Sequence, residues 1–209
     1  MVVLTELKQT GPERFLARFD NDETVRTTLN VVSDLGLYSG KELSEEEFIR
    51  IQGDSSLALC KQRAMRIIGA RPMSRKELRN RLKEKGESEE NADLTVEWLS
   101  DLRLLDDAQY AAMCVRHYAA KGYGKGKIQN ELFRRGVPRE FWETALDQLP
   151  DQDDTIDRLL RKKIRSENPD RDELHRAMDY LYRRGFRRDE INAAVARWRD
   201  EFEVNDDGI

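Results

Sequence analysis

Arginine and lysine side chains gather beside three glycines of this 209-residue chain, Gly86, Gly136 and Gly185, which recur at nearly equal intervals. Guanidinium and ammonium groups bind phosphates and carboxylates, so a row of such clusters is typical of a surface that follows a polyanion or an acidic protein. The side chains that we take as candidate contacts for a partner or DNA are Arg79, Lys83, Lys121, Lys125, Lys127, Arg134, Arg135, Arg183, Arg184, Arg187 and Arg188.

The same clusters have a second interpretation, a solvated helix face. Carboxylates close in the sequence, such as Glu84, Glu131 and Asp179, would balance the positive charges on such a face. For any single arginine we favour the solvated face. For the row as a whole the two interpretations are evenly balanced, because the same placement recurs three times.

An aromatic side chain, Tyr123, lies between Lys121 and Lys125. Aromatic rings beside cations stack on nucleic-acid bases, so Tyr123 is a candidate for stacking. A tyrosine in a turn more often packs over the neighbouring helix, and we favour that interpretation.

No constellation of catalytic residues is visible in the sequence. The two histidines, His117 and His175, are isolated, so no Ser-His-Asp or Cys-His pairing is predicted. The two cysteines, Cys60 and Cys114, have no metal-ligand spacing and are predicted to be buried, reduced thiols. We therefore expect no metal, no cofactor and a protein that is not an enzyme.

The elements that must position the basic clusters are repeated helices. An inward apolar stripe that ends at a glycine predicts an amphipathic helix with a left-handed terminus. Three copies predict three tandem three-helix repeats, over 57–105, 106–150 and 151–203, in an elongated array. The copies are Leu78-x3-Leu82-x3-Gly86, Ile128-x3-Leu132-x3-Gly136 and Ala177-x3-Leu181-x3-Gly185.

Residues 1–56 differ from the repeats. Short segments rich in β-branched and aromatic residues, separated by turn residues, predict a small antiparallel sheet of two or three strands. Ser44, followed by three glutamates, predicts a helix start. Gly53-Asp-Ser-Ser56 predicts that this short helix ends and that the first helix of the repeats begins. The sequence thus predicts a β-rich extension over 1–56 and a frayed tail over 204–209.

Charged residues make up 37% of the chain, against about 25% in an ordinary domain. The net charge of −4 argues against a protein that coats DNA indiscriminately, although residues 57–149 carry 18 basic and 14 acidic side chains. No apolar run is long enough to span a membrane, and the first residues do not form a signal peptide. We expect a cytoplasmic protein, and nothing in the sequence requires more than a monomer.

Three of these segments, in this order, resemble the RecX family, bacterial regulators of the RecA recombinase. The first is Arg71-Pro-Met-Ser-Arg-Lys-Glu-Leu-Arg-Asn-Arg-Leu-Lys-Glu-Lys-Gly86. Leu104-Leu-Asp-Asp107, with Tyr110-Ala111, is the second. Lys121-Gly-Tyr-Gly-Lys-Gly-Lys-Ile-Gln-Asn-Glu-Leu-Phe-Arg-Arg-Gly136 is the third. The resemblance is strongest over 58–140.

The resemblance implies a curved body of three three-helix repeats that binds within the helical groove of a RecA–single-stranded DNA filament. There it would restrain filament growth, ATP hydrolysis and strand exchange, in DNA repair and SOS control. The third repeat departs from the second, because Tyr180 stands where Glu131 stands. The motif residues at turns are interpreted as turns and caps rather than contacts; they are Leu105, Asp106, Asp107, Gly122, Gly124 and Gly136.

Two other functions stay open at this point. Helices joined by short turns also fit a helix-turn-helix module that binds DNA directly. Weak direct binding of DNA by a filament regulator also stays open. A plain helical scaffold fits the composition as well.

Overall fold

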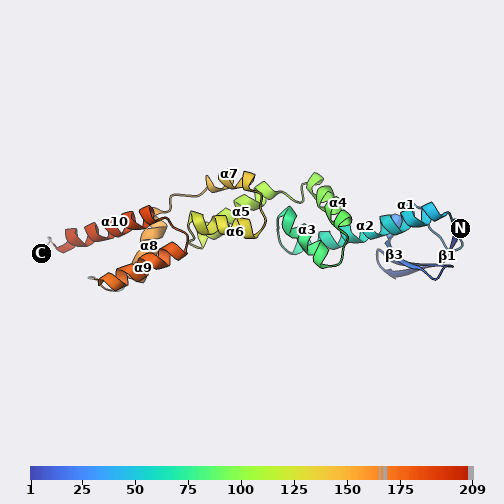
Figure 1. Ribbon diagram of the computed structural model, residues 1–209, viewed down its shortest axis with the longest axis horizontal. Helices are drawn as coiled ribbons and strands as arrows, with labels where there is room; N and C mark the ends of the chain where they lie inside the picture. The colour runs from blue at the N-terminus through green and yellow to red at the C-terminus, as the bar shows by residue number, and fades with distance from the viewer. Residues whose placement is uncertain (165, 167–168, 207–209) are drawn as a thin grey trace. The chain divides into compact units, whose positions relative to one another are not determined.

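The computed structural model describes residues 1–164, 166 and 169–206, with side chains described up to residue 200. The chain divides into two compact units, a first unit over Met1–Leu105 and a second unit from Asp106 onward. Helices dominate both units, and a small sheet occupies the start of the first (Figure 1). The predicted class, mainly α with a β-rich N-terminal extension, is confirmed.

The sheet of the first unit is antiparallel and has four strands in the order β3-β2-β1-β4. The two or three strands that the sequence predicts are β1 to β3. The fourth, β4, is only two residues long, which is too short to show a period-two pattern. A short helix, α1, also follows β3 without a sequence prediction. The bounds are β1 Val2–Gly11, β2 Arg14–Phe19, β3 Thr24–Thr28, α1 Leu29–Asp34 and β4 Glu42–Leu43.

Helix α2 (Glu45–Ala70) is continuous, so the predicted break at Gly53–Ser56 is wrong. Its predicted start is right, because the Ser44 hydroxyl accepts a hydrogen bond from the Glu47 N–H and the Glu47 carboxylate accepts one from the Ser44 N–H. Tertiary contacts override the weak helix propensity of the segment. The buried Ser55 hydroxyl donates a 2.8 Å hydrogen bond to the Thr27 hydroxyl of β3.

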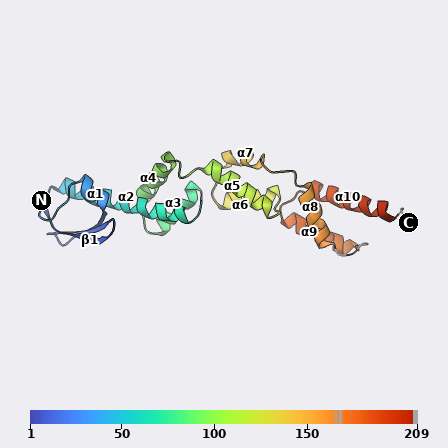
Figure 2. The ribbon, with the colours of Figure 1, turned by 180° about the vertical axis from the view of Figure 1, so that it is seen from behind.

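Helix α2 contributes to two cores of the first unit. Phe48 and Ile51, from its N-terminal half, pack with the inner face of the sheet. Cys60 and Ala64, from its C-terminal half, pack with α3 (Arg75–Glu84) and α4 (Glu89–Asp101). Figures 1 and 2 show the sheet and the helix pair against opposite halves of α2. The first repeat is therefore the C-terminal half of α2 with α3 and α4.

The second unit contains the other two predicted repeats. Repeat 2 consists of α5, α6 and a broken third helix of a 3-10 turn (η1) and α7, and repeat 3 consists of α8 to α10. Because α10 continues to Asp206, residues 204–206 of the predicted frayed tail are helical, and 207–209 lie outside the described residues. The bounds are α5 Asp107–Ala120, α6 Lys125–Arg134, η1 Arg139–Phe141, α7 Trp142–Leu146, α8 Asp153–Lys163, α9 Arg171–Arg183 and α10 Arg188–Asp206.

The three glycines end the second helix of each repeat, as predicted. Gly86, Gly136 and Gly185 have φ values of 86°, 68° and 89°, in the left-handed region that favours glycine. Their N–H groups donate back to the preceding turn, and the next residue donates one step further back, which is the Schellman arrangement. The leucines of the repeated pattern, Leu82, Leu132 and Leu181, are fully buried.

Candidate partner-binding groove

Repeats 2 and 3 meet through main-chain atoms. The end of α9 approaches the start of α6, where the N–H of Gly124 donates to the carbonyl of Arg184 at 2.9 Å and the N–H of Gly126 to that of Gly185 at 3.0 Å. A Cβ on Gly124 would lie 2.5 Å from the Gly185 oxygen, and one on Gly185 would lie 2.1 Å from the Lys127 nitrogen. Gly124, interpreted from the sequence as a cap, is therefore also a contact between repeats.

We call this contact between the end of α9 and the start of α6 the joint. The side chain of Arg184 adds further contacts to it. Its guanidinium donates to the carbonyls of Lys121 and Gly122, at 2.8 and 3.0 Å, where α5 ends. It also lies 5.1 Å from the Tyr123 ring and 5.0 Å from the Tyr180 ring, within the range of cation–π attraction.

Tyr123 also packs over helix α5, where its ring centroid lies 5.8 Å from that of Tyr118, and this packing over a neighbouring helix is the arrangement favoured from the sequence. Tyr180 supports Arg184 through its own ring contact. Lys121 is exposed, and its ammonium lies 5.9 Å from the Tyr118 ring.

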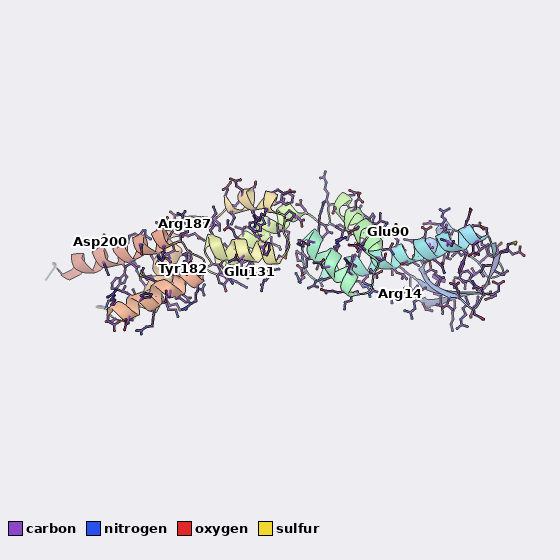
Figure 3. The ribbon with its side chains drawn as sticks, in the orientation of Figure 1. Arg14, Glu90, Glu131, Tyr182, Arg187 and Asp200 are labelled. Atoms are coloured by element: carbon purple, nitrogen blue, oxygen red, sulfur yellow. The ribbon has the colours of Figure 1, made fainter. Side chains whose placement is uncertain are left out.

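The joint brings five of the predicted basic residues to one groove. Figure 3 labels Tyr182 near the end of α9 and Arg187 at the start of α10. The volume of the groove is about 880 Å³, and amide side chains of α6 and the exposed ring of Tyr182 complete its lining. We call it the basic groove, and its five cations are Lys125, Lys127, Arg183, Arg187 and Arg188.

Most of the charge in the basic groove is uncompensated. Three of its cations, Lys125, Arg183 and Arg188, have side chains that pair with no other side chain among the described residues. Arg187 pairs with Asp189 at 2.9 Å, and that aspartate is the acidic residue of the lining. The ammonium of Lys127 lies 3.9 Å from the carboxylate of Glu131, outside the lining. Five cations and one carboxylate in one hollow attract phosphates or clustered carboxylates of a partner.

Two of the predicted contacts, Arg79 and Lys83, belong to the first unit and are already paired. Arg79 bonds to Asp93 and, at 2.6 Å, to Glu89, while the ammonium of Lys83 lies 3.1 Å from Glu89. These hydrogen bonds, that to Asp93 above all, raise the pKa of Arg79 above its ordinary value. The two cations thus join α3 to α4, and the solvated-face interpretation fits them better.

Arg134 and Arg135 surround the buried carboxylate of Glu131 in α6. The Tyr118 hydroxyl donates to Glu131 at 3.1 Å, and Arg134 donates to it at 2.6 Å. Arg135 donates to the hydroxyls of Tyr110 and Tyr118, both at 2.8 Å. Arg135 is therefore part of the packing of repeat 2, whereas the Arg134 side chain is largely exposed to solvent.

The Glu131 cluster makes stability depend on pH. Burial acts to raise the pKa of Glu131, but hydrogen bonds from Arg134 and Tyr118 outweigh it, so the pKa lies below its ordinary value. The ionised carboxylate therefore stabilises the fold above the unfolded-state pKa of about 4.3, and this contribution is lost as the pH falls through the lower folded-state pKa.

We expect Glu131→Gln to lower the free energy of unfolding most at neutral pH. Because the native carboxylate becomes protonated in acid, the difference from the unmodified protein should shrink below about pH 4. Urea denaturation across this range measures it, with the exposed Glu140→Gln as control. A difference that stays constant with pH would contradict the assignment.

Other kinds of site receive less support. Cys60 and Cys114 are both buried, as predicted. Over the described residues, no three His, Cys, Asp or Glu side chains come together in a way that could hold a metal ion. Within the same residues, every helix is too short or too polar to cross a membrane.

Comparison with known families identifies the architecture. Three domain models match in succession: the first three-helix domain of RecX over residues 60–99, the second over 106–146 and the third over 151–195. Together they cover more than half of the chain. The chain belongs to the RecX family. The resemblance stated from the sequence motifs is thereby confirmed.

Named relatives agree with this RecX assignment. A regulatory protein RecX of Caldanaerobacter subterraneus is 23% identical over 93% of this chain and 98% of its own length. Another, of Xanthomonas axonopodis pv. citri, is 35% identical over 64% of this chain and 84% of its own length.

Solved RecX structures share the fold. A crystal structure of regulatory protein RecX superposes with a TM-score of 0.75 and 21% identity, covering 94% of this chain and 100% of its own. RecX from Lactobacillus salivarius gives a TM-score of 0.63 at 22% identity, over 68% of this chain and 96% of its own.

In RecX terms, the basic groove lies between the second and third three-helix domains. Lys125 and Lys127 come from the second domain, and the three arginines come from the third. Tyr182, Gln129 and Asn130 were not predicted to lie beside them. Two signals were present in the sequence: Tyr182 adjoins Arg183, and Gln129 and Asn130 follow Lys125 and Lys127 at helical spacing.

Proposed function

We propose that this protein is a non-enzymatic regulator that binds a RecA–single-stranded DNA filament and restrains filament growth, ATP hydrolysis and strand exchange. Membership of a family whose relatives are named regulatory proteins supports a regulatory role. The observation that carries the rest is the basic groove, where Lys125, Arg183 and Arg188 converge with no partner among the described side chains.

A filament of protein and DNA offers the groove two kinds of anion. Phosphates of the bound strand and acidic side chains of the recombinase both suit exposed guanidinium groups. Electrostatic attraction of this kind raises the association rate and weakens as salt increases. The basic groove is therefore proposed as the surface that anchors the protein on the filament. Once anions of the filament occupy the groove, the bound protein restrains the filament.

The test is the rate of ATP hydrolysis by a cognate RecA on single-stranded DNA. The purified protein is expected to slow hydrolysis at stoichiometric amounts. Reversal of the three unpaired cations, Lys125→Glu, Arg183→Glu and Arg188→Glu together, removes the anchor and should raise the concentration for half-inhibition by at least about tenfold. Arg135 and Arg184 are left unchanged because they hold the fold.

A charge-matched control separates the groove from net charge. Arg116, Arg158 and Arg176 are exposed on α5, α8 and α9 outside the groove lining. Their joint reversal to glutamate should leave inhibition nearly intact. Full inhibition by a folded groove variant would refute the anchor, and no inhibition by the unmodified protein would refute the function.

The helix-turn-helix alternative predicts a different result. A direct DNA-binding module would shift duplex DNA in a gel without recombinase, with an affinity that falls steeply with salt. Such binding together with an unaffected ATPase rate would favour that alternative.

A further inference from the structure

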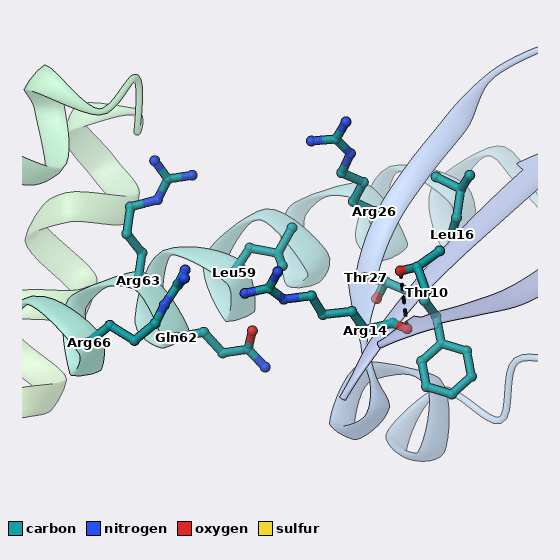
Figure 4. Close-up of a pocket in the computed structure, with 10 residues that line it drawn as sticks. Thr10, Arg14, Leu16, Arg26, Thr27, Leu59, Gln62, Arg63 and Arg66 are labelled. Carbon is teal, nitrogen blue, oxygen red and sulfur yellow. Dashed lines mark hydrogen bonds between the residues drawn. The ribbon is translucent and has the colours of Figure 1, made fainter. Parts of the chain in front are cut away.

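A second set of arginines surrounds a cleft in the first unit, between the sheet and α2. Arg14 comes from β2, Arg26 from β3, and Arg63 and Arg66 from successive turns of α2. Figure 4 shows these four side chains around one opening, with Leu59 and Gln62 of the helix between them. We call this hollow, of about 440 Å³, the arginine cleft.

The arginine cleft has a net positive charge that the fold does not neutralise. Arg63 is held by Glu87 at 2.8 Å and by the carbonyl of Lys85. The side chains of Arg14, Arg26 and Arg66 pair with no side chain in the described part of the chain, and no carboxylate lines the cleft. Like charges that lie close together without counter-charges repel one another, so an anionic ligand that binds among them would remove this repulsion.

An apolar surface adjoins these cations. The cleft shares Thr10, Arg14, Gln62 and Arg66 with a neighbouring hollow of about 770 Å³. The lining of that hollow includes Met65 and Trp98, with one carboxylate, Glu13. The ammonium of Lys61 lies 4.9 Å from the Trp98 ring. The combination offers guanidinium groups and, next to them, an aromatic and a thioether surface.

The neutral polar groups of the cleft are largely engaged within the fold. The Thr27 hydroxyl accepts a hydrogen bond from Ser55, and the Gln62 amide donates to Glu13. Few groups therefore remain to pair with the amides of a bound peptide. Free guanidinium groups beside an apolar surface instead suit a ligand that repeats an anion and an aromatic ring along its length.

We propose that the arginine cleft is a binding site for single-stranded nucleic acid, with the free arginines on successive phosphates and unstacked bases against the apolar surface. A single strand has one phosphate per nucleotide, so any register satisfies the cations and binding is independent of sequence. Stacked bases in a duplex do not expose the faces that this surface would contact. The site needs no recombinase and goes beyond the proposed function, which rests on the basic groove.

The test is fluorescence anisotropy of a labelled single-stranded oligonucleotide of about 20 nucleotides with the full chain alone. We expect Arg14→Glu, Arg26→Glu and Arg66→Glu together to weaken binding by at least about tenfold at about 50 mM salt. Loss of three phosphate contacts should also reduce the slope of log affinity against log salt by about 2.

Matched variants make the result specific to the cleft. Arg50→Glu, Lys76→Glu and Lys85→Glu change the same charge at exposed positions of the first unit outside the cleft, and should keep most of the affinity. Hydrogen–deuterium exchange on the unmodified protein should show protection of β2, β3 and α2 when the oligonucleotide is added. This measurement needs no variant to fold.

Three outcomes would overturn the proposal. The first is no binding of the oligonucleotide by the unmodified protein at low salt. The second is an affinity and salt slope that the cleft variant shares with the control variant. The third is displacement of the labelled strand by a polyglutamate peptide at a lower concentration than unlabelled single strand requires, which would assign the cleft to an acidic protein. None of these measurements uses recombinase, so their outcome is independent of the ATPase test of the proposed function.

Discussion

Gly185→Ala is expected to separate repeat 3 from repeat 2. The new Cβ would lie 2.1 Å from the main-chain nitrogen of Lys127, and the residue has a φ of 89°. The left-handed conformation costs about 1–2 kcal/mol for a residue with a side chain, and the two hydrogen bonds across the joint contribute about 1 kcal/mol each. The free energy of unfolding of the second unit should fall by at least about 3 kcal/mol.

Denaturant unfolding and hydrogen exchange measure this effect together. The N–H groups of Gly124 and Gly126, which donate across the joint, should lose their protection. The basic groove is built across the same joint, so the inhibition of RecA that we propose for this protein should be lost as well.

Gly86→Ala is the matched control, because Gly86 ends the equivalent helix of the first repeat with a φ of 86°. No atom lies within 4 Å of a Cβ added there. Only the conformational cost of about 1–2 kcal/mol is expected. Equal losses of stability from the two substitutions would show that the close approach at Gly185 is not needed.

Gly53→Pro is expected to break α2 and to weaken both cores of the first unit. Proline removes a helical hydrogen bond and clashes with the preceding turn, at a cost of about 3 kcal/mol or more in a helix interior. Phe48 and Ile51 lie before this point and Cys60 and Ala64 after it, in different cores. Denaturant unfolding should show a large loss, and circular dichroism a loss of helix.

Gly53→Ala tests the same position in the opposite direction. Gly53 is exposed, and a Cβ there meets no atom within 4 Å. Alanine favours the helix over glycine by about 0.5–1 kcal/mol, so this variant should be more stable. If the helix were broken at this point, as the sequence suggested, proline would be tolerated and alanine would bring no gain.

Much of the helical architecture could be predicted because it depends on local sequence patterns. Apolar residues at helical spacing, followed by a glycine, specify an amphipathic helix and its end, so Leu132 and Gly136 were interpretable without a structure. The run at Gly53 misled for the opposite reason. Its local preference is for a break, but burial of Ser55 against Thr27 decides the conformation.

The sites were predictable only in part, since they depend on contacts between distant segments. The sequence showed a row of cations but could not separate Arg184, which is held by carbonyls of α5, from Arg183, which lies in the basic groove. The arginine cleft was not predicted at all. Arg14 and Arg26 lie on different strands, and Arg66 is 40 residues from Arg26, so nothing in the sequence links them.

The joint between the second and third repeats has a consequence for how such a protein can change. Its two hydrogen bonds join main-chain atoms, and the close approach depends on the glycines. The side chains of Lys125, Arg183 and Arg188 project from the same segments without taking part in those bonds. The contact between the repeats thus depends on main-chain atoms, whereas the proposed binding of a ligand depends on side chains of the same segments. Substitution of these cations can retune the preferred ligand while the two repeats keep their mutual placement.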